Sequence, residues 1–422
     1  MFKSKKIIAV VITALLAVSV LAGCGNSGGG SASDEGERTE IRIGMITPLT
    51  GVLAGFGEGT PWTEELLVDY VNNELGGIEV DGKKLPIKLI SYDSESDTTK
   101  CAELAQKLIT DDKVDMMVVR HTPETVNPVS AVCERYEIPT VSMDAPVDAW
   151  LAEGPYEWVF HTHWNLDTMY KQYKALWEKA GATKGTKIGI IFANDADGTA
   201  WKATFADQIK ADGFELVDPG QYPAGTTDFT DIINQFKTEG VEILAGTNTN
   251  PDFGTFWRQS KQQGFEPKFV TMGKAYLLRA DAEAIGADLM NGLTGEVWWS
   301  PVHPFKSALT GETPASLTEL YLEASDREIT QPMGYKYASF EVAIDALTRA
   351  GTLDKPAIRD AIAATDIETV IGPVKYNDEH YSLSPLTGGQ WVVDSTGTLQ
   401  LNIVDNSLAP EIPLTGELQL LK

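Results

Sequence analysis

Cysteine is scarce in this chain: Cys24, Cys101 and Cys133 are the only three in 422 residues. So few thiols exclude a small disulfide-stapled scaffold and a cysteine-based zinc module. Cys101 lies near the start of one predicted helix and Cys133 near the end of the next. Two such helices packed parallel would hold the Cα atoms beyond the ~7 Å limit of a disulfide, so we expect two buried free thiols. A disulfide is the alternative, since these bonds form outside the cell.

Positive charge is also scarce, with 34 Lys and Arg against 60 Asp and Glu. Removing Lys3, Lys5 and Lys6, which belong to an N-terminal leader discussed below, leaves 31 basic residues against the same 60 acidic ones. Such an acidic surface repels nucleic acid and anionic lipid, so neither is expected as a partner.

Catalytic motifs are absent as well. The chain has no spaced G-x-G-x-x-G, no P-loop and no G-x-S-x-G elbow, and its five histidines form no recognisable nucleophile–base pair. We therefore do not expect an enzyme. His161 and His163 share one face of a predicted strand and, with His121 and His303, raise the alternative of a metal site. Their spacing favours packing or hydrogen-bonding histidines, so neither a metal nor a cofactor is expected.

Asp195 and Asp197 in ANDADG raise two further alternatives, a catalytic pair and a calcium loop. The twelve-residue calcium-loop pattern is not met, because its first acid and its terminal Glu are missing. An Asx-rich turn is the favoured interpretation. If the site is functional, Asp197 accepts a hydrogen bond from the ligand.

Only the N-terminus carries a long apolar run. Three lysines precede an uncharged stretch, residues 7–23, which predicts a secretory signal over residues 1–23; a retained membrane anchor is the alternative. The segment Leu21–Cys24 resembles a bacterial lipobox, which implies that Cys24 is lipidated and becomes the first residue. Residues 24–40 are Gly/Ser-rich and then charged, and we expect a flexible tether.

From residue 41 onward, short apolar runs alternate with amphipathic ones. Strands are expected at 41–46, 86–93, 114–119, 138–142, 158–163, 187–192, 241–246 and 268–273. Helices are expected at 60–73, 98–110, from Asn127–Pro128 onward, 166–180, 199–212, 230–239, 253–263, 316–324, 335–350 and 356–364, before a β-like tail from about 370. This alternation predicts an α/β fold with doubly wound parallel sheets, and its length and restart near residue 166 predict two similar lobes.

In such sheets a ligand binds beyond the carboxyl ends of the strands. The loops that follow the predicted strands are rich in small polar, Gly, Pro and aromatic residues, and helix N-termini point back at the same place. Several tryptophans lie in or beside these loops: Trp62, Trp150, Trp164, Trp201, Trp257, Trp298 and Trp299. Packing explains about half of them, whereas aromatic walls suit a flat or apolar ligand, or a quaternary ammonium.

The sequence from 41 to about 400 resembles the type I periplasmic solute-binding proteins of ABC importers, in the branch of the leucine/isoleucine/valine receptors. The likeness rests on the order and spacing of IGMITPLTG, NNELGGI, SYDSESD, IIFANDADG, FTDIINQFK, WRQSKQQGF and TVIGPVKYN. It implies two Rossmann-like lobes joined by a three-stranded hinge that crosses near 161–165, 295–300 and 371–376. The N-terminal lobe would comprise 41–162 and 298–372, and the C-terminal lobe 163–297 and 373–422.

The resemblance and the residues of the strand-end loops together indicate which residues contact the ligand. The expected set is Phe56, Thr122, Thr125, Asp144, Ala145, Trp164, Asp197, Asn248, Thr249, Lys274 and Trp298. Lys274 stands where receptors for amino acids often have an acid for the ligand's amino group. That exchange suggests a ligand with negative or acceptor character.

Together these features predict a monomeric, extracytoplasmic lipoprotein, tethered to the bacterial cell membrane by its lipid, that binds a small solute and delivers it to an ABC permease. The expected order of ligands is a small aromatic or apolar carboxylate, then a modified amino acid or amide, then a branched-chain amino acid. A sensory module read by a partner receptor and a secreted hydrolase are the alternatives, and fold alone does not separate the first from transport.

Overall fold

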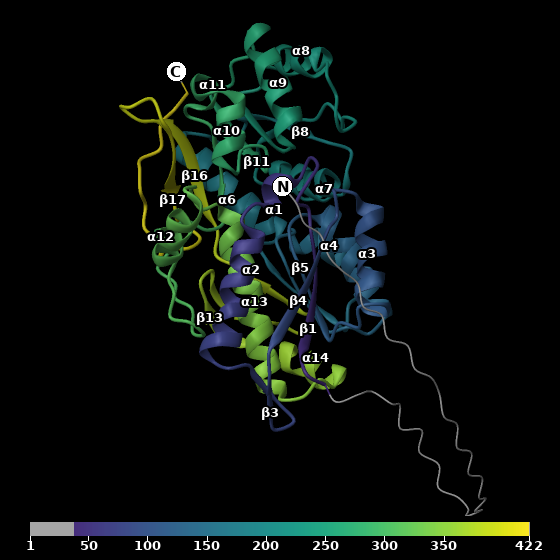
Figure 1. Cartoon of the computed structure of the whole chain (residues 1–422). Coiled ribbons are helices and arrows are strands. Elements are labelled where there is room, and N and C mark those ends of the chain that lie inside the picture. The colour runs from purple at the N-terminus through teal and green to yellow at the C-terminus, as the bar shows by residue number, and fades with distance from the viewer. Residues whose placement is uncertain (1–37, 422) are drawn as a thin grey trace, which may run out of the picture. The chain divides into compact units, whose positions relative to one another are not determined.

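The computed structural model describes residues 38–421, so the predicted signal segment and Cys24 lie outside the described residues. Two sheets dominate a single compact unit that begins at Thr39 (Figure 1). The first sheet has the order β15-β7-β6-β5-β1-β4 and is parallel throughout. Its strands are β1 (Ile41–Thr47), β4 (Ile87–Asp93), β5 (Met116–Val119), β6 (Thr140–Met143), β7 (Val159–His163) and β15 (Tyr381–Leu383).

The second sheet has the order β17-β16-β12-β11-β10-β8-β9. Its first five strands in the chain are parallel, and the last two form an antiparallel edge. They are β8 (Lys187–Phe192), β9 (Glu215–Val217), β10 (Ile243–Thr247), β11 (Phe269–Gly273), β12 (Thr294–Val297), β16 (Thr387–Val393) and β17 (Leu399–Asp405). Two small hairpins add β2 (Ile78–Val80) with β3 (Lys83–Leu85), and β13 (Asp366–Thr369) with β14 (Gly372–Lys375). The α/β class with two doubly wound lobes is confirmed.

Helices cover both faces of each sheet. Those around the first sheet are α1 (Ala54–Gly57), α2 (Thr60–Asp69) with a π-helical turn (Tyr70–Glu74), α3 (Thr98–Thr110), α4 (Pro123–Arg135), α5 (Val147–Leu151), α12 (Pro314–Ser325), α13 (Gln331–Ala350) and α14 (Lys355–Ala363). Those around the second are α6 (Leu166–Lys179), α7 (Ala196–Ala211), α8 (Thr230–Glu239), α9 (Asn250–Gln262), α10 (Arg279–Ile285) and α11 (Ala287–Met290). Among residues 38–421, no helix combines the length and hydropathy that a membrane crossing requires.

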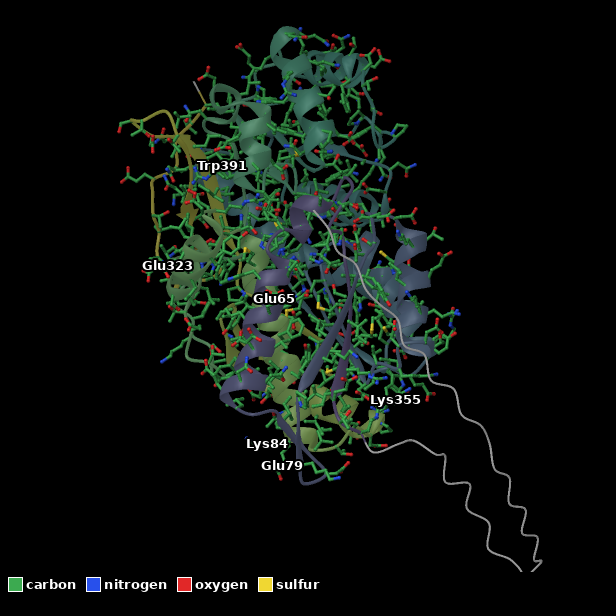
Figure 2. The ribbon with its side chains drawn as sticks, in the orientation of Figure 1. Glu65, Glu79, Lys84, Glu323, Lys355 and Trp391 are labelled. Atoms are coloured by element: carbon green, nitrogen blue, oxygen red, sulfur yellow. The ribbon has the colours of Figure 1, made fainter. Side chains whose placement is uncertain are left out.

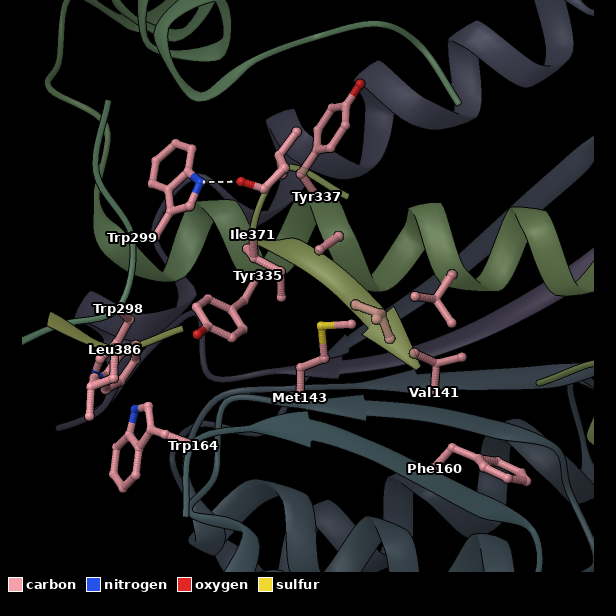
Figure 3. Packing of buried hydrophobic residues seen from close by; sticks show 14 of the residues in the cluster. Val141, Met143, Phe160, Trp164, Trp298, Trp299, Tyr335, Tyr337, Ile371 and Leu386 are labelled. Atoms are coloured by element: carbon pink, nitrogen blue, oxygen red, sulfur yellow. Dashed lines mark hydrogen bonds between the residues drawn. The ribbon is translucent and has the colours of Figure 1, made fainter. Parts of the chain in front are cut away.

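Alternate residues of the strands enter different cores, because successive side chains of a strand point to opposite faces. Met45 and Met116 lie on the face of the first sheet that α2 and α13 cover. Ile46 and Met117 lie on the opposite face, which α3 and α4 cover. Figure 3 shows Trp164, Trp298 and Tyr335 at one end of the first of these cores and Val141 and Phe160 at the other. The charged side chains Glu65, Glu79, Lys84, Glu323 and Lys355 are exposed (Figure 2).

Two predicted features of the chain path are wrong. The helix expected to start at Asn127–Pro128 begins at Pro123, with Thr122 as its N-cap, because Thr122–Pro123 is an equivalent cap-and-proline pair five residues earlier. The hinge crossing expected near 371–376 lies between Leu383 and Thr387. Residues 372–375 pair within the β13–β14 hairpin, and β15 then joins the first sheet beside β7 before the chain enters the second sheet.

The contact between Trp299 and α13 fixes where the chain returns from the second sheet to the first. The buried indole of Trp299 donates a hydrogen bond from Nε1 to the carbonyl oxygen of Val370 at 2.9 Å, drawn as a dashed line in Figure 3. Its ring lies so close to Gly334 that a Cβ there would be 2.5 Å from ring atoms. This close packing of the Trp299 ring against α13 therefore requires glycine at position 334.

We expect Gly334→Ala to lower the free energy of unfolding by about 1–3 kcal/mol, because buried overpacking forces ring or helix to move. Chemical denaturation measures the change. Gly254→Ala in α9 is the control, since its Cβ would meet the end of the Arg258 side chain at 3.1 Å and the Ile285 side chain at an ordinary contact distance of 3.5 Å, and it should leave stability equal or higher. Equal stability of Gly334→Ala and the natural protein would contradict this packing argument.

Candidate ligand-binding site

The carboxyl ends of the central strands of both sheets meet at one cavity. Its lining residues come from the carboxyl ends of eight strands or from the segments that follow them: β1, β5, β6 and β7 of the first sheet and β8, β10, β11 and β12 of the second. In each sheet this is where the strand order reverses, at β1/β5 and at β8/β10, which is the expected place for a ligand. About 20 Å³ is accessible to the centre of a water molecule, room for little more than one water. An organic solute therefore fits only after the lining moves.

Seven of the predicted ligand-binding residues line this cavity: Phe56, Thr122, Asp144, Trp164, Asp197, Lys274 and Trp298. They follow seven different strands, in keeping with the rule that ligands bind beyond strand ends.

The other four predicted residues do not line the cavity. Thr125 is buried within α4, and Ala145 is buried with its carbonyl oxygen 2.7 Å from Nε2 of His161. Asn248 donates from Nδ2 to the hydroxyl of Tyr222 at 2.6 Å, and this bond directs its side chain toward the interior of the second lobe. Thr249 is the N-cap residue of α9. Thr125, Ala145 and Asn248 are buried within their own lobes, and Thr249 is partly exposed outside the cavity lining.

Six lining residues were not among those predicted: Pro123, Pro146, His163, Trp201, Thr247 and Glu296. Trp201 and His163 had been noted for other reasons, as a loop-adjacent tryptophan and as part of a metal alternative. Glu296 lies inside a strand, β12, and the analysis of loops passed over it. An acid within an otherwise buried strand is the signal that would have found it.

Lys274 connects the two lobes electrostatically. Its Nζ lies 3.3 Å from the Asp197 carboxylate of the second lobe and 3.7 Å from the Glu124 carboxylate of the first. Burial raises the pKa of Asp197 to about 6. Burial alone would lower the pKa of Lys274, but the nearby Glu124 and Asp197 carboxylates raise it above its usual value. The ammonium is therefore held between carboxylates from opposite sides of the cleft. The suggestion that Lys274 serves an anionic ligand is not supported by these contacts, because its charge is already compensated.

Asp144 lies on the first-lobe wall with charged side chains behind it. Arg120 is fully buried and donates from Nη2 to the Glu64 carboxylate at 3.1 Å and from Nη1 to the carbonyl oxygen of Lys336 at 2.8 Å. Burial raises the pKa of Glu64 and of Asp144 to about 7 each, although Arg120 opposes it. Burial also lowers the pKa of Lys336 to about 7. The wall thus holds ionisable groups that titrate near neutral pH.

Indole rings form the aromatic part of the lining. The ring centroids of Trp164 and Trp201 are 5.7 Å apart, and those of Trp164 and Trp298 are 6.0 Å apart. His163 stands edge-on to Trp298 at 4.7 Å. The Nε1 atoms of all three tryptophans are buried without a hydrogen-bond partner among the described residues. They offer donors and π-faces to a ligand.

Three strand ends at the site carry non-glycine residues with positive φ. These are His121 after β5 (φ 100°), Asp144 after β6 (φ 71°) and Lys274 after β11 (φ 63°). This region of backbone conformation is unfavourable for residues with a Cβ and clusters at ligand-binding positions. The tight turns direct the side chains of Asp144 and Lys274 into the cleft instead of along the strand.

The histidines and cysteines of the described chain differ in their surroundings. His161 lies 2.8 Å from the Ser142 hydroxyl through Nδ1, and residues 38–421 hold no group of three or more His, Cys, Asp or Glu suited to a metal ion. Cys101 and Cys133 are buried free thiols, as expected.

Comparisons with known proteins agree with this architecture. A family model described as "Periplasmic binding protein" matches residues 40–392. The chain is 26% identical over 368 residues to the "Leu/Ile/Val-binding protein homolog 8" of Brucella abortus, covering 83% of this chain and 88% of that protein. It is 25% identical over 341 residues to homolog 7 from the same organism, covering 78% and 82%.

Solved structures share the fold at low identity. A leucine-binding protein from Thermotoga maritima superposes with a TM-score of 0.72 at 18% identity, covering 87% of this chain and 99% of that one. A branched-chain amino acid transporter substrate-binding protein from Streptococcus pneumoniae, in complex with isoleucine, gives 0.72 at 20%, covering 87% and 100%. A solute-binding protein of an ABC transporter from R. palustris, in complex with 4-hydroxybenzoate, gives 0.73 at 17%, covering 87% and 96%.

Two α/β lobes with a cavity between their strand ends define a binding protein of the type I periplasmic class. The chain belongs to the periplasmic binding protein family of ABC-transporter solute-binding proteins, together with the Leu/Ile/Val-binding protein homologues. This is a family of binding proteins and not of enzymes.

Proposed function

We propose that this protein is an extracytoplasmic lipoprotein of an ABC importer that captures a small organic solute by closure of its two lobes. The observation that carries the proposal is the cavity itself, which takes its lining from both sheets and is spanned by Lys274. A ligand there contacts both lobes only when they are closed, so binding favours the closed form.

The class of solute follows from the site and from its relatives. Aromatic rings line the cavity beside a few polar groups, which suits an aromatic or apolar carboxylate or an amino-acid-like compound. Proteins of this fold have been solved with isoleucine and with 4-hydroxybenzoate, which fall into these two classes. We propose that the seven lining residues named above contact the ligand and that an ABC permease receives it.

The lobes are proposed to divide near residues 162 and 298, as the sequence indicated. The third boundary moves to the segment between Leu383 and Thr387, where the chain leaves the first sheet. Cys24 is proposed to carry the lipid that tethers this monomeric body to the membrane.

A ligand screen by thermal unfolding tests the proposal. A ligand present at 100 times its Kd is expected to add about 2.7 kcal/mol to the free energy of unfolding, which gives a clear rise in Tm. The control is the variant Trp164→Ala/Trp298→Ala, which loses two walls of the cavity and should lose most of the rise. If no amino acid, modified amino acid, amide or aromatic acid raises Tm, the proposed function is contradicted.

A further inference from the structure

Acidic groups outnumber basic ones around the cavity. Asp144, Asp197 and Glu296 line it, whereas Lys274 is the cationic side chain among the described lining residues. Lys274 is matched by Asp197 and by Glu124, so it has no charge to offer an anion. A ligand that brings a net negative charge would add to an existing excess of carboxyl groups in a buried place, which is costly.

The carboxyl groups differ in whether the protein satisfies them. Glu296 accepts from the backbone N–H of Lys274 at 3.1 Å and from the hydroxyl of Tyr173 at 2.9 Å. Asp144 is 2% exposed; the backbone N–H of His121 favours its ionised form, but no side chain among the described residues donates a hydrogen bond to either carboxylate oxygen. A buried carboxyl group with so few donors is costly unless another donor reaches it, and Asp144 lines the cavity.

The cations behind Asp144 are committed elsewhere. The Arg120 guanidinium binds the Glu64 carboxylate, the Lys336 carbonyl and the Ser339 hydroxyl, and the Lys336 ammonium donates to the carbonyl oxygen of Glu58. The titratable and charged groups around Asp144 are Arg120 and His121 at the end of β5, Glu64 on α2, Tyr335 and Lys336 on α13, and His163 on β7. Arg120 is paired with Glu64 at 3.1 Å, and burial lowers the pKa of Lys336 to about 7, so Lys336 carries less than a full positive charge near neutral pH.

Aromatic faces complete the environment. Phe56, Trp164, Trp201 and Trp298 line the same cavity as Asp144, and such rings attract cations through their π-faces. We propose that the cleft selects ligands that carry a positively charged nitrogen, with Asp144 as the counter-ion. This inference rests on the proposed function and reverses the order expected from the sequence, because it places aromatic carboxylates without a nitrogen last.

The test compares compounds that share a skeleton and differ in charge. One set is leucine, 3-methylbutylammonium and the anion 4-methylpentanoate; the other is benzylammonium, benzamide and benzoate. Thermal unfolding of the full chain ranks them, and calorimetry gives Kd for those that bind. Compounds with a cationic nitrogen are expected to bind at least tenfold more tightly than their anionic or neutral counterparts.

The pH dependence provides a second readout. Burial raises the pKa of Asp144 to about 7 in the free protein, and a bound cation favours the ionised carboxylate. Affinity for a cationic nitrogen should therefore rise as pH increases from 5.5 to 8, with proton release on binding. Asp144→Asn should weaken binding at pH 8 by about tenfold or more and flatten this profile. Glu341→Gln is the control, because burial raises the pKa of Glu341 to about 7 as well, yet its side chain lies on α13 outside the cavity lining.

The outcomes separate the two proposals. Tighter binding of 4-methylpentanoate or benzoate than of the matched cations overturns the inference and leaves the proposed function standing. Affinity that falls as pH rises does the same, and this profile needs no variant. If no compound binds in these two sets or in the wider ligand screen, both the proposed function and this inference are contradicted.

Discussion

Lys274→Met is expected to lower the free energy of unfolding by about 3 kcal/mol at pH 7.5, because it leaves the Asp197 and Glu124 carboxylates without their shared cation. The Lys274 side chain is 11% exposed and the Asp197 side chain 7%, so solvent screens this pair little. Urea unfolding measures the change. Lys171→Met is the matched control, since the Lys171–Asp167 pair at 2.6 Å is about half exposed and should contribute under about 1 kcal/mol.

The loss should depend on pH in a defined direction. Without Lys274, the folded-state pKa values of Asp197 and Glu124 rise above their unfolded values. A carboxyl group whose folded pKa is raised costs stability once pH exceeds the unfolded value, and the cost disappears at lower pH. The difference between Lys274→Met and the natural protein should therefore be largest above pH 7 and shrink toward pH 5. A difference that is constant across this range would show that the ammonium does not act by charge.

Arg120→Met is the second change with a large expected effect, about 3–5 kcal/mol of lost stability. Arg120 is completely buried, and its removal leaves Glu64 and Asp144 with only Lys336 as a nearby cation. The double variant Arg120→Met/Glu64→Gln removes both charges of the ion pair at 3.1 Å and should lose less than Arg120→Met alone. If the double variant loses as much as the two single variants together, the pair is not coupled.

The sequence predicted most strands and helices within a few residues, because parallel strands buried on both faces read as short apolar runs between amphipathic segments. The predicted start of α4 was wrong because Thr122–Pro123 and Asn127–Pro128 both satisfy the rules for a helix start, and the local sequence does not distinguish them. The sequence did not predict β15, because this strand pairs with β7 across about half the length of the chain, as in the pair Tyr381 and His161. Such pairing leaves no local pattern to detect.

The sequence could predict which loops form the candidate site, but not which side chains contact one another there. Strand-end loops led to Phe56, Asp144, Trp164 and Lys274. The contacts of Lys274 were not foreseen because its partner Glu124 follows a strand of the other lobe, a pairing that the order of residues does not reveal. Asn248 illustrates the reverse case, since its bond to Tyr222 was invisible in the order of residues.

The central claim, that two lobes close over a small solute, is tested most directly by a distance between labels on the two lobes. Gln106→Cys on α3 and Ala203→Cys on α7, in a Cys24→Ser background, give one exposed site on each side. Burial raises the pKa of Cys101 to about 11 and of Cys133 to about 12, so the native thiols react slowly. Pulsed electron spin resonance should show a broad or longer distance without ligand and a single shorter one with it. An identical distance distribution in both states, with a ligand bound, would contradict the account.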